Sequence, residues 1–294
     1  MPATNDNKQN KKIVKSLTLA VMLFVVLLIA SVVLLFFVVG KEESLSGADQ
    51  AIRLSAQGGF ECEYAEAQKL YPYGEGVLKV TDERIAYLTL SGNEIYSSSV
   101  NYQNPTCVIN GGYAAVCDID GYAFSMYSTE NLVYSISTDQ KIKSAYVSDD
   151  GLCAIITDSS DAFGEIIIYD TEGNFIAQWI SYDSGYPLAV QFNSDSSMLA
   201  VSTVNTDGAT YESYVKLFSI EKTDSKYYAE DYAIYSIEDD TIVSCLTYVG
   251  DKLFAFSADS IYVLGDSGFT ALDLQIGVVN YEMSVGDMLY IIYS

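Results

Sequence analysis

Aspartates gather in three short polar segments, each of which follows an apolar run. The segments read CDIDG, TDSSDAFGE and NTDGATYE, and they contain Asp118, Asp120, Asp158, Asp161 and Asp207. Calcium is the cation that such residues would hold, because it prefers about six to eight oxygen ligands, many of them carboxylates. None of the segments has the full D-x-[DN]-x-[DN]-G-x5-E spacing of a dedicated calcium loop. The five aspartates are therefore candidate calcium ligands, with solvated acidic loops as the alternative.

A second motif surrounds the only tryptophan of the chain. Residues 166–179 read IIIYDTEGNFIAQW, in which Asp170, Gly173 and Trp179 loosely match the A-x-D-x-x-T-G-K-x-x-W docking string of quinone-cofactor propellers. The threonine of that string is missing, and Trp179 lies one residue too far along. An acidic, glycine-containing turn between two β-branched runs also predicts an ordinary hairpin. We favour the hairpin, with Trp179 packing between neighbouring units, and expect no bound cofactor.

The chain contains no histidine. This excludes Ser–His–Asp and Cys–His catalysis and every zinc site that uses histidine. The five cysteines are odd in number and form no C-x-x-C pair, so neither a disulfide framework nor a zinc cluster is expected. Four of them lie in apolar runs and are expected to be small buried residues: Cys107, Cys117, Cys153 and Cys245. No catalytic residue is nominated, and we expect no enzyme.

Repeated hairpins are the elements that must position these residues. Two short apolar strands flank a polar turn six times, and the turns lie near Gly76, Gly112, Gly151, Ser196, Asp251 and Asp287. A second set of hairpins alternates with the first, over residues 85–100, 122–137, 166–181, 215–237 and 260–274. Four antiparallel strands in roughly 40 residues are typical of a β-propeller blade. The sequence therefore predicts an all-β fold, a propeller of four-stranded antiparallel blades, with five complete blades and a partial sixth.

An apolar segment at residues 17–40 precedes the repeats and contains no charged residue. A helix of this length spans a bilayer core. Four lysines within residues 1–16 favour a cytoplasmic N-terminus, a tether over 41–58 and an extracytoplasmic propeller over 59–294. A cleaved signal peptide is the alternative, but its apolar core is usually only about 7 to 15 residues and ends at an A-x-A-like site. We predict a single-pass signal anchor in the cell membrane, and a propeller that is truncated or irregularly closed at its C-terminus.

The part after the predicted anchor is strongly acidic. The chain has 15 basic and 39 acidic residues, of which five lysines and one acid precede Glu42, so the remainder carries 10 − 38 = −28. Nucleic acids and anionic membrane surfaces are polyanions and would be repelled. A nucleic-acid partner is therefore not expected.

Two segments carry a resemblance to known families. VSDDGLCAIIT (147–157) and FNSDSSMLAVST (192–203) look like the turns of WD40-like and YVTN-type propellers. With its basic N-terminus, anchor and acidic propeller, the chain resembles an uncharacterised, domain-of-unknown-function family of single-pass membrane-anchored envelope proteins of Gram-positive bacteria. That resemblance implies a fold and a location, and no activity.

We expect a non-catalytic binding or scaffolding module of the cell envelope, which docks a protein, peptide or glycan. Aromatic residues in an apparently long loop and one acidic residue are the candidate partner contacts: Tyr227, Tyr228, Tyr232 and Asp259. An envelope enzyme on the same scaffold, a carbohydrate-active hydrolase or a quinone-linked oxidoreductase, is the alternative. A sensor is a third reading, although the cytoplasmic tail is too short to hold a domain.

Overall fold

The computed structural model describes residues 68–223, 226–238, 240–272, 279–285 and 288–293. All of them belong to the compact unit Gly58–Ser294. The predicted tail, anchor and tether lie outside the described residues. Within the described part of the chain there is no helix long and apolar enough to cross a membrane.

Five sheets, here called blades 1 to 5, are each four-stranded antiparallel meanders whose strands follow chain order. Blades 1 and 2 comprise β1 (Lys69–Tyr73), β2 (Gly76–Val80), β3 (Arg84–Thr89), β4 (Glu94–Ser99), β5 (Pro105–Asn110), β6 (Tyr113–Asp118), β7 (Ala123–Ser128) and β8 (Leu132–Ser137). Blades 3 and 4 comprise β9 (Ile142–Val147), β10 (Cys153–Thr157), β11 (Glu165–Tyr169), β12 (Phe175–Ile180), β13 (Tyr186–Phe192), β14 (Met198–Asn205), β15 (Glu212–Thr223) and β16 (Lys226–Ser236). Blade 5 comprises β17 (Cys245–Val249), β18 (Lys252–Phe256), β19 (Ile261–Gly265) and β20 (Gly268–Ala271).

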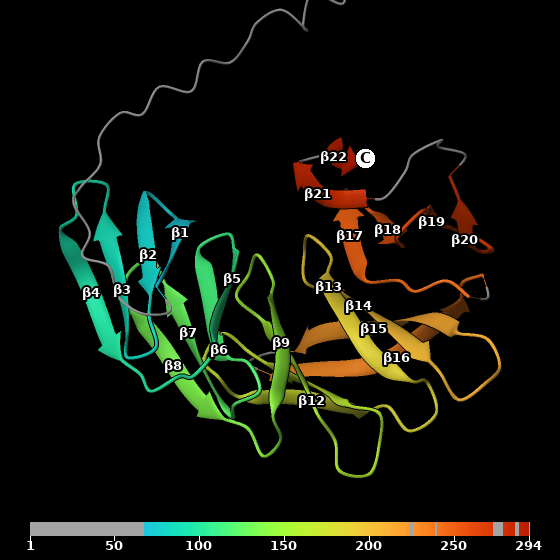
Figure 1. Cartoon of the computed structure of the whole chain (residues 1–294), viewed down its shortest axis with the longest axis horizontal. Coiled ribbons are helices and arrows are strands. Elements are labelled where there is room, and N and C mark those ends of the chain that lie inside the picture. The colour runs from blue at the N-terminus through green and yellow to red at the C-terminus, as the bar shows by residue number, and fades with distance from the viewer. Residues whose placement is uncertain (1–67, 224–225, 239, 273–278, 286–287, 294) are drawn as a thin grey trace, which may run out of the picture. The chain divides into compact units, whose positions relative to one another are not determined.

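A two-stranded sheet, β21 (Val279–Val285) and β22 (Met288–Tyr293), follows blade 5. In Figure 1 the strands of each blade lie side by side in chain order. Repeated four-stranded antiparallel sheets of this length are the blades of a β-propeller. The predicted fold class is confirmed: all-β, with five four-stranded blades and a partial sixth among the described residues.

The core lies between blades, because the second strands of blades 2, 3 and 4 are buried on both faces. In β10, Cys153 and Ile155 face the cluster shared with blade 2, whereas Ala154 and Ile156 face the cluster shared with blade 4. Side chains of a strand alternate between its two faces, so a continuous apolar run serves two interfaces at once. Four such clusters join the successive blades 1 to 5. Each fully buried isoleucine in them contributes about 1.5–3 kcal/mol.

Tyrosine hydroxyls connect neighbouring blades at the edges of these clusters. Tyr73 of blade 1 donates a hydrogen bond to the carbonyl oxygen of Gly112 in blade 2, at 2.7 Å. Tyr96 donates in the same way to the carbonyl oxygen of Ser128, also at 2.7 Å. A tyrosine supplies a large apolar ring for the interface and a polar end for an exposed backbone acceptor. This use accounts for part of the high tyrosine content.

Glycines in hairpin turns make room for tyrosine rings of the preceding blade. Gly173 has a φ of +85°, and a Cβ placed on it would lie 2.8 Å from the ring of Tyr134. Gly151 has the same φ and would bring a Cβ to 2.7 Å from the ring of Tyr113. Both positions need a residue that accepts left-handed backbone and has no side chain.

Candidate functional site

The hairpin formed by β15 and β16 is the longest of the blade hairpins. Its strands have 12 and 11 residues, compared with five and six in the equivalent β11 and β12 of blade 3. This corrects the expectation of a long aromatic loop, because all three tyrosines lie in strand β16, and Tyr227 and Tyr228 pair with residues of β15. The segment KYYAEDYAIYS alternates in burial along most of its length, as an outer strand does.

Three large apolar side chains of β16 are exposed, with Tyr228 on one face of the strand and Ile234 on the other. Tyr228 is 53% exposed, Tyr232 is 66% exposed and Ile234 is 54% exposed. Glu230 and Asp231 lie between them and are also exposed. We call these five residues the β16 surface. It combines aromatic anchors with carboxylates, and β16 is the outermost strand of its sheet.

A β-bulge divides β16 into two halves that face different blades. Leu217 pairs with Ala233 and Phe218 pairs with Asp231, so Tyr232 is an extra residue without a partner across the ladder. Before the bulge, Tyr227 and Ala229 pack against the cluster between blades 3 and 4. After it, Ala233 and Tyr235 pack against the cluster between blades 4 and 5. One inserted residue reverses which face each side chain meets, and it pushes Tyr232 outward.

The predicted partner tyrosines therefore separate into two kinds. Tyr228 and Tyr232 are exposed on the β16 surface, whereas Tyr227 is half-buried against the core. The ammonium of Lys222 lies 4.7 Å from the centroid of the Tyr227 ring. The fourth candidate, Asp259, is exposed in the turn before β19 and accepts a hydrogen bond from the Ser257 hydroxyl at 3.1 Å.

Lys216 stabilises the base of the β16 surface. Its Nζ lies 2.9 Å from a carboxylate oxygen of Asp231 and 5.2 Å from the ring centroids of both Trp179 and Phe218. Its side chain is only 16% exposed. The Trp179 and Phe218 rings lie 5.7 Å apart and belong to blades 3 and 4. The prediction that Trp179 packs between units is thus confirmed.

The residues of the quinone-like string form a capped turn. Oδ1 of Asp170 accepts hydrogen bonds from the backbone N–H groups of Glu172 and Asn174, at 2.9 and 2.8 Å. Gly173 occupies the left-handed position of the turn. This is the hairpin that the sequence favoured.

Two of the predicted calcium ligands meet around a lysine. Nζ of Lys143 lies 2.8 Å from Oδ1 of Asp120 and 3.0 Å from Oδ2 of Asp158. A hydrogen bond from Lys143, and then its charge, lower the pKa of Asp120 below its ordinary value. Oδ1 of Asp118 accepts hydrogen bonds from the backbone N–H groups of Gln103 and Asn104. The lysine supplies the positive charge that a cation would otherwise bring.

The other two predicted ligands, Asp161 and Asp207, are exposed in separate loops of blades 3 and 4. Among the residues that the structure describes, no three His, Cys, Asp or Glu side chains come together as a metal site would require. The calcium site stays a prediction. Sequence reasoning missed Lys143 and Lys216. The available signal was the scarcity of basic residues, since only ten occur from Glu42 onward.

The buried titratable groups have pKa values that suit structure rather than catalysis. Burial raises the pKa of the Cys107 thiol to about 12 and raises those of Cys117 and Cys153 as well. These three thiols are buried and stay protonated at neutral pH, whereas Cys245 is half-buried. The expectation that the cysteines are buried is confirmed for those three. A catalytic thiolate would need a lowered pKa instead.

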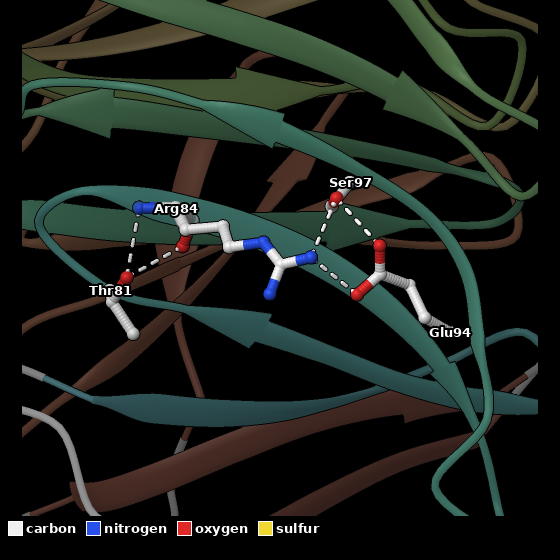
Figure 2. A network of polar contacts seen from close by, with 4 residues as sticks. All are labelled: Thr81, Arg84, Glu94 and Ser97. Carbon is white, nitrogen blue, oxygen red and sulfur yellow. Dashed lines mark hydrogen bonds and ion pairs between the residues drawn. The ribbon is translucent and has the colours of Figure 1, made fainter.

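An ion pair on blade 1 is a surface contact. Figure 2 shows the Arg84 guanidinium beside the carboxylate of Glu94 and the hydroxyl of Ser97, while the backbone N–H of Arg84 donates to the Thr81 hydroxyl. The side chains of Arg84 and Glu94 are 54% and 40% exposed. Exposed pairs of this kind contribute about 0–1 kcal/mol. The network connects β3 to β4 on the surface and does not line a pocket.

Three solved structures resemble this chain at low sequence identity, and the first of them, with a TM-score above 0.5, shares its fold. KlAtg21, solved in complex with the coiled coil of AgAtg16, is similar over 74% of this chain and 73% of that one, with a TM-score of 0.54 and 9% identity. The WD40 domain of Neurospora crassa Pan2 gives a TM-score of 0.46 and 12% identity, over 73% of this chain and 67% of that one. Hydrazine synthase of Kuenenia stuttgartiensis gives 0.46 and 15%, over 65% and 61%.

Two sequence comparisons complete these findings. No curated protein matches the sequence. Residues 52–280 match a protein family described as "Family of unknown function (DUF5711)". The match covers most of the chain, including all five blades.

Proposed function

The chain belongs to the DUF5711 family of unknown function, and from that premise we propose a function on its own residues: a non-catalytic binding module of the cell envelope that docks a protein through the β16 surface. In this proposal the helix predicted at residues 17–40 anchors the chain in the cell membrane, with the N-terminus cytoplasmic and the propeller outside. The likeness to a chain in complex with a coiled coil concerns the fold alone. The chemistry of the partner therefore has to follow from this chain.

One observation carries the proposal: the extended hairpin places Tyr228, Tyr232 and Ile234 in solvent on an outermost strand. Tyrosines are common anchors of protein interfaces because they bury a large, rigid area at low entropic cost. An exposed apolar edge strand is also a risk of aggregation, which proteins usually avoid with charges or Pro. A partner that covers this surface gives a reason to keep it.

Charge specifies the partner further. Glu230 and Asp231 lie among the exposed apolar residues, and the region from Glu42 onward carries a net charge of −28. A complementary protein surface has an apolar groove with lysine or arginine at its rim. Such steering raises the association rate more than it raises the affinity.

The alternative, an envelope enzyme, receives no support from the described residues. Asp120 and Asp158 are neutralised by Lys143 rather than paired for acid–base work. A glycosidase needs two carboxylates about 5–10 Å apart, one of them with a raised pKa. In the described part of the chain, both carboxyl groups with a shifted pKa, Asp120 and Asp195, are shifted downward.

Affinity capture tests the proposal with the full-length chain in crosslinked native cells. We expect a reproducible protein partner that is retained at least tenfold less by the double variant Tyr228→Ser/Tyr232→Ser. The matched control is Tyr122→Ser/Tyr182→Ser, since those tyrosines are 50% and 59% exposed on other blades. The control should retain the partner. Equal retention by both variants, or substrate turnover by the purified chain without any partner, would overturn the proposal.

A further inference from the structure

A cleft of about 530 Å³ lies between blades 3 and 4. Its walls come from three hairpin turns, those between β9 and β10, β11 and β12, and β13 and β14, and from the adjoining ends of β15 and β16. Clefts that bind small molecules typically measure about 300–1,000 Å³. This cleft is distinct from the β16 surface, although both use the long hairpin.

Apolar side chains form the deepest part of the cleft. Leu152 is 1% exposed and Ile220 is 5% exposed, and both belong to the cluster between blades 3 and 4. Tyr227 lies against the same cluster and adds an aromatic ring to the wall. An apolar patch beside an aromatic ring accepts the C–H face of a ligand while the ligand's polar groups point outward.

Charges of both signs line the rim. Asp150 and Asp195 supply two carboxylates, and Lys222 supplies one ammonium. The Ser197 hydroxyl and backbone N–H both donate to Oδ1 of Asp195, which lowers the pKa of that carboxyl and keeps it ionised. Lys222 lies over the ring of Tyr227 rather than in an ion pair within the described residues.

This mixture selects against ligands of one charge. Two carboxylates repel phosphates and other anions, and the Lys222 ammonium repels cations that would otherwise sit between Asp150 and Asp195. A neutral ligand rich in hydroxyl groups meets no such repulsion. It can donate to the carboxylates and accept from the ammonium in the same pose.

A buried hydroxyl adds a further polar group to the wall. Ser196 lines the cleft, is 5% exposed and has a φ of +57°. Its Oγ finds no hydrogen-bond partner among the described residues. A buried polar atom without a partner destabilises the fold, so a nearby ligand or water that satisfies it stabilises the turn.

We propose that the cleft between blades 3 and 4 is a binding site for a neutral saccharide, of about two or three sugar rings by its volume. The sugar lies with its C–H face toward Tyr227 and the apolar wall beneath it, its hydroxyls donate to Asp150 and Asp195, and Lys222 donates to a ring or hydroxyl oxygen. This site goes beyond the proposed protein docking and stands independently of it, because none of its rim charges belongs to the β16 surface.

Saturation-transfer NMR and calorimetric titration test the site with the full-length chain in a detergent that has no sugar headgroup. The probes are cellotriose, maltotriose and tri-N-acetylchitotriose, with glycylglycine and inorganic phosphate as charged comparisons. We expect at least one trisaccharide to bind, and neither charged probe to bind. Asp195→Asn and Lys222→Met should each weaken that binding about tenfold or more.

Lys226→Met is the matched control for Lys222→Met, because Lys226 lies on the same hairpin but does not line the cleft. It should bind the trisaccharide within twofold of the unmodified chain. Lys222 is fully exposed, so its variant keeps the fold, and Trp179 fluorescence during heating verifies this. Absence of trisaccharide binding, preference for phosphate or glycylglycine, or equal binding by Lys222→Met would overturn the inference. Loss of protein capture with retained sugar binding, or the reverse, separates this site from the proposed docking surface.

Discussion

At the residue scale, a few single lysines organise the acidic and aromatic side chains around them. Lys143 joins two carboxylates on adjacent loops, Lys216 lies between an aspartate and two aromatic rings, and Lys222 covers a tyrosine at the cleft. In a domain with so many acids, a lysine side chain is stabilised where it lies beside carboxylates, whose mutual repulsion it reduces, or over an aromatic ring. These contacts position the loops and the long hairpin, so they prepare the surfaces that we assign to binding.

Gly173 is a residue at which a single added methyl group should reduce stability. Gly173→Ala would force a Cβ to 2.8 Å from the Tyr134 ring at a φ of +85°. We expect a loss of roughly 1–3 kcal/mol in the free energy of unfolding, because strain and overlap add. Urea unfolding followed by Trp179 fluorescence measures it. Gly112→Ala is the control, since nothing lies within 4 Å of its Cβ position, and it should change stability little. Equal stability of the two variants would contradict the packing described here.

Buried thiols and phenols predict a decline in stability at alkaline pH. Burial raises the pKa of Cys107 to about 12 and that of Tyr248 to about 12. Their values in an unfolded chain are about 8.5 and 10. Because the folded-state values are higher, the stabilisation is complete below about pH 8.5 and is lost as the pH rises toward 12. Urea titrations between pH 7 and pH 10 should show a falling free energy of unfolding, with a shallower fall in Cys107→Ala. A flat or rising profile would refute this reading.

At the scale of elements, the bulge in β16 sets which residues reach the partner surface. Deleting Tyr232 removes the extra residue and leaves a regular ladder, in which Ala233 and Tyr235 still pair with Leu217 and Val215 and still face their cluster. We expect the deletion to change the free energy of unfolding by less than about 1 kcal/mol, since no apolar side chain leaves its cluster. Tyr232→Ala keeps the bulge and removes only an exposed ring, so it should stay within about 0.5 kcal/mol. Thermal and urea unfolding compare them. A deletion variant that is much less stable than Tyr232→Ala would contradict this pairing.

The hairpin pattern was predictable because each blade repeats the same local signals. Turns near Gly76, Gly151 and Ser196 lie between paired strands as the sequence indicated. The tyrosines of β16 were assigned to a loop because their charged neighbours and the bulge break the strict alternation that marks a strand. Strand pairing with β15 outweighed that local signal.

The candidate sites were less predictable, since they depend on contacts between blades. Asp120 and Asp158 were chosen for their own spacing, yet Lys143 on another strand determines their surroundings. The cleft combines Asp150 and Asp195 from two different turns with Lys222 from strand β15. The spacing of these residues along the chain does not predict their contacts, because the contacts depend on how one blade packs on the next.

At the scale of the whole molecule, the propeller and the predicted anchor can be tested separately. Removing residues 1–40 should shift the protein from the membrane fraction to the soluble fraction, because the apolar segment is then absent. Carbonate washing of membranes, followed by immunoblotting, measures the distribution. The full-length chain should resist the wash, and a C-terminal phosphatase fusion should be active only if the propeller is outside the cytoplasm. Full-length chain in the soluble fraction would contradict the anchor, and an inactive fusion would contradict the orientation.

Site-specific photo-crosslinking in native cells tests the central claim of protein docking most directly. A photoreactive phenylalanine analogue replaces Tyr232 in one full-length variant and Tyr122 in another, and the two positions are 66% and 50% exposed. We predict one discrete protein adduct from position 232 and none from position 122. The adduct should contain a protein with an apolar groove rimmed by basic residues. No adduct from position 232, or the same adducts from both positions, would contradict the account.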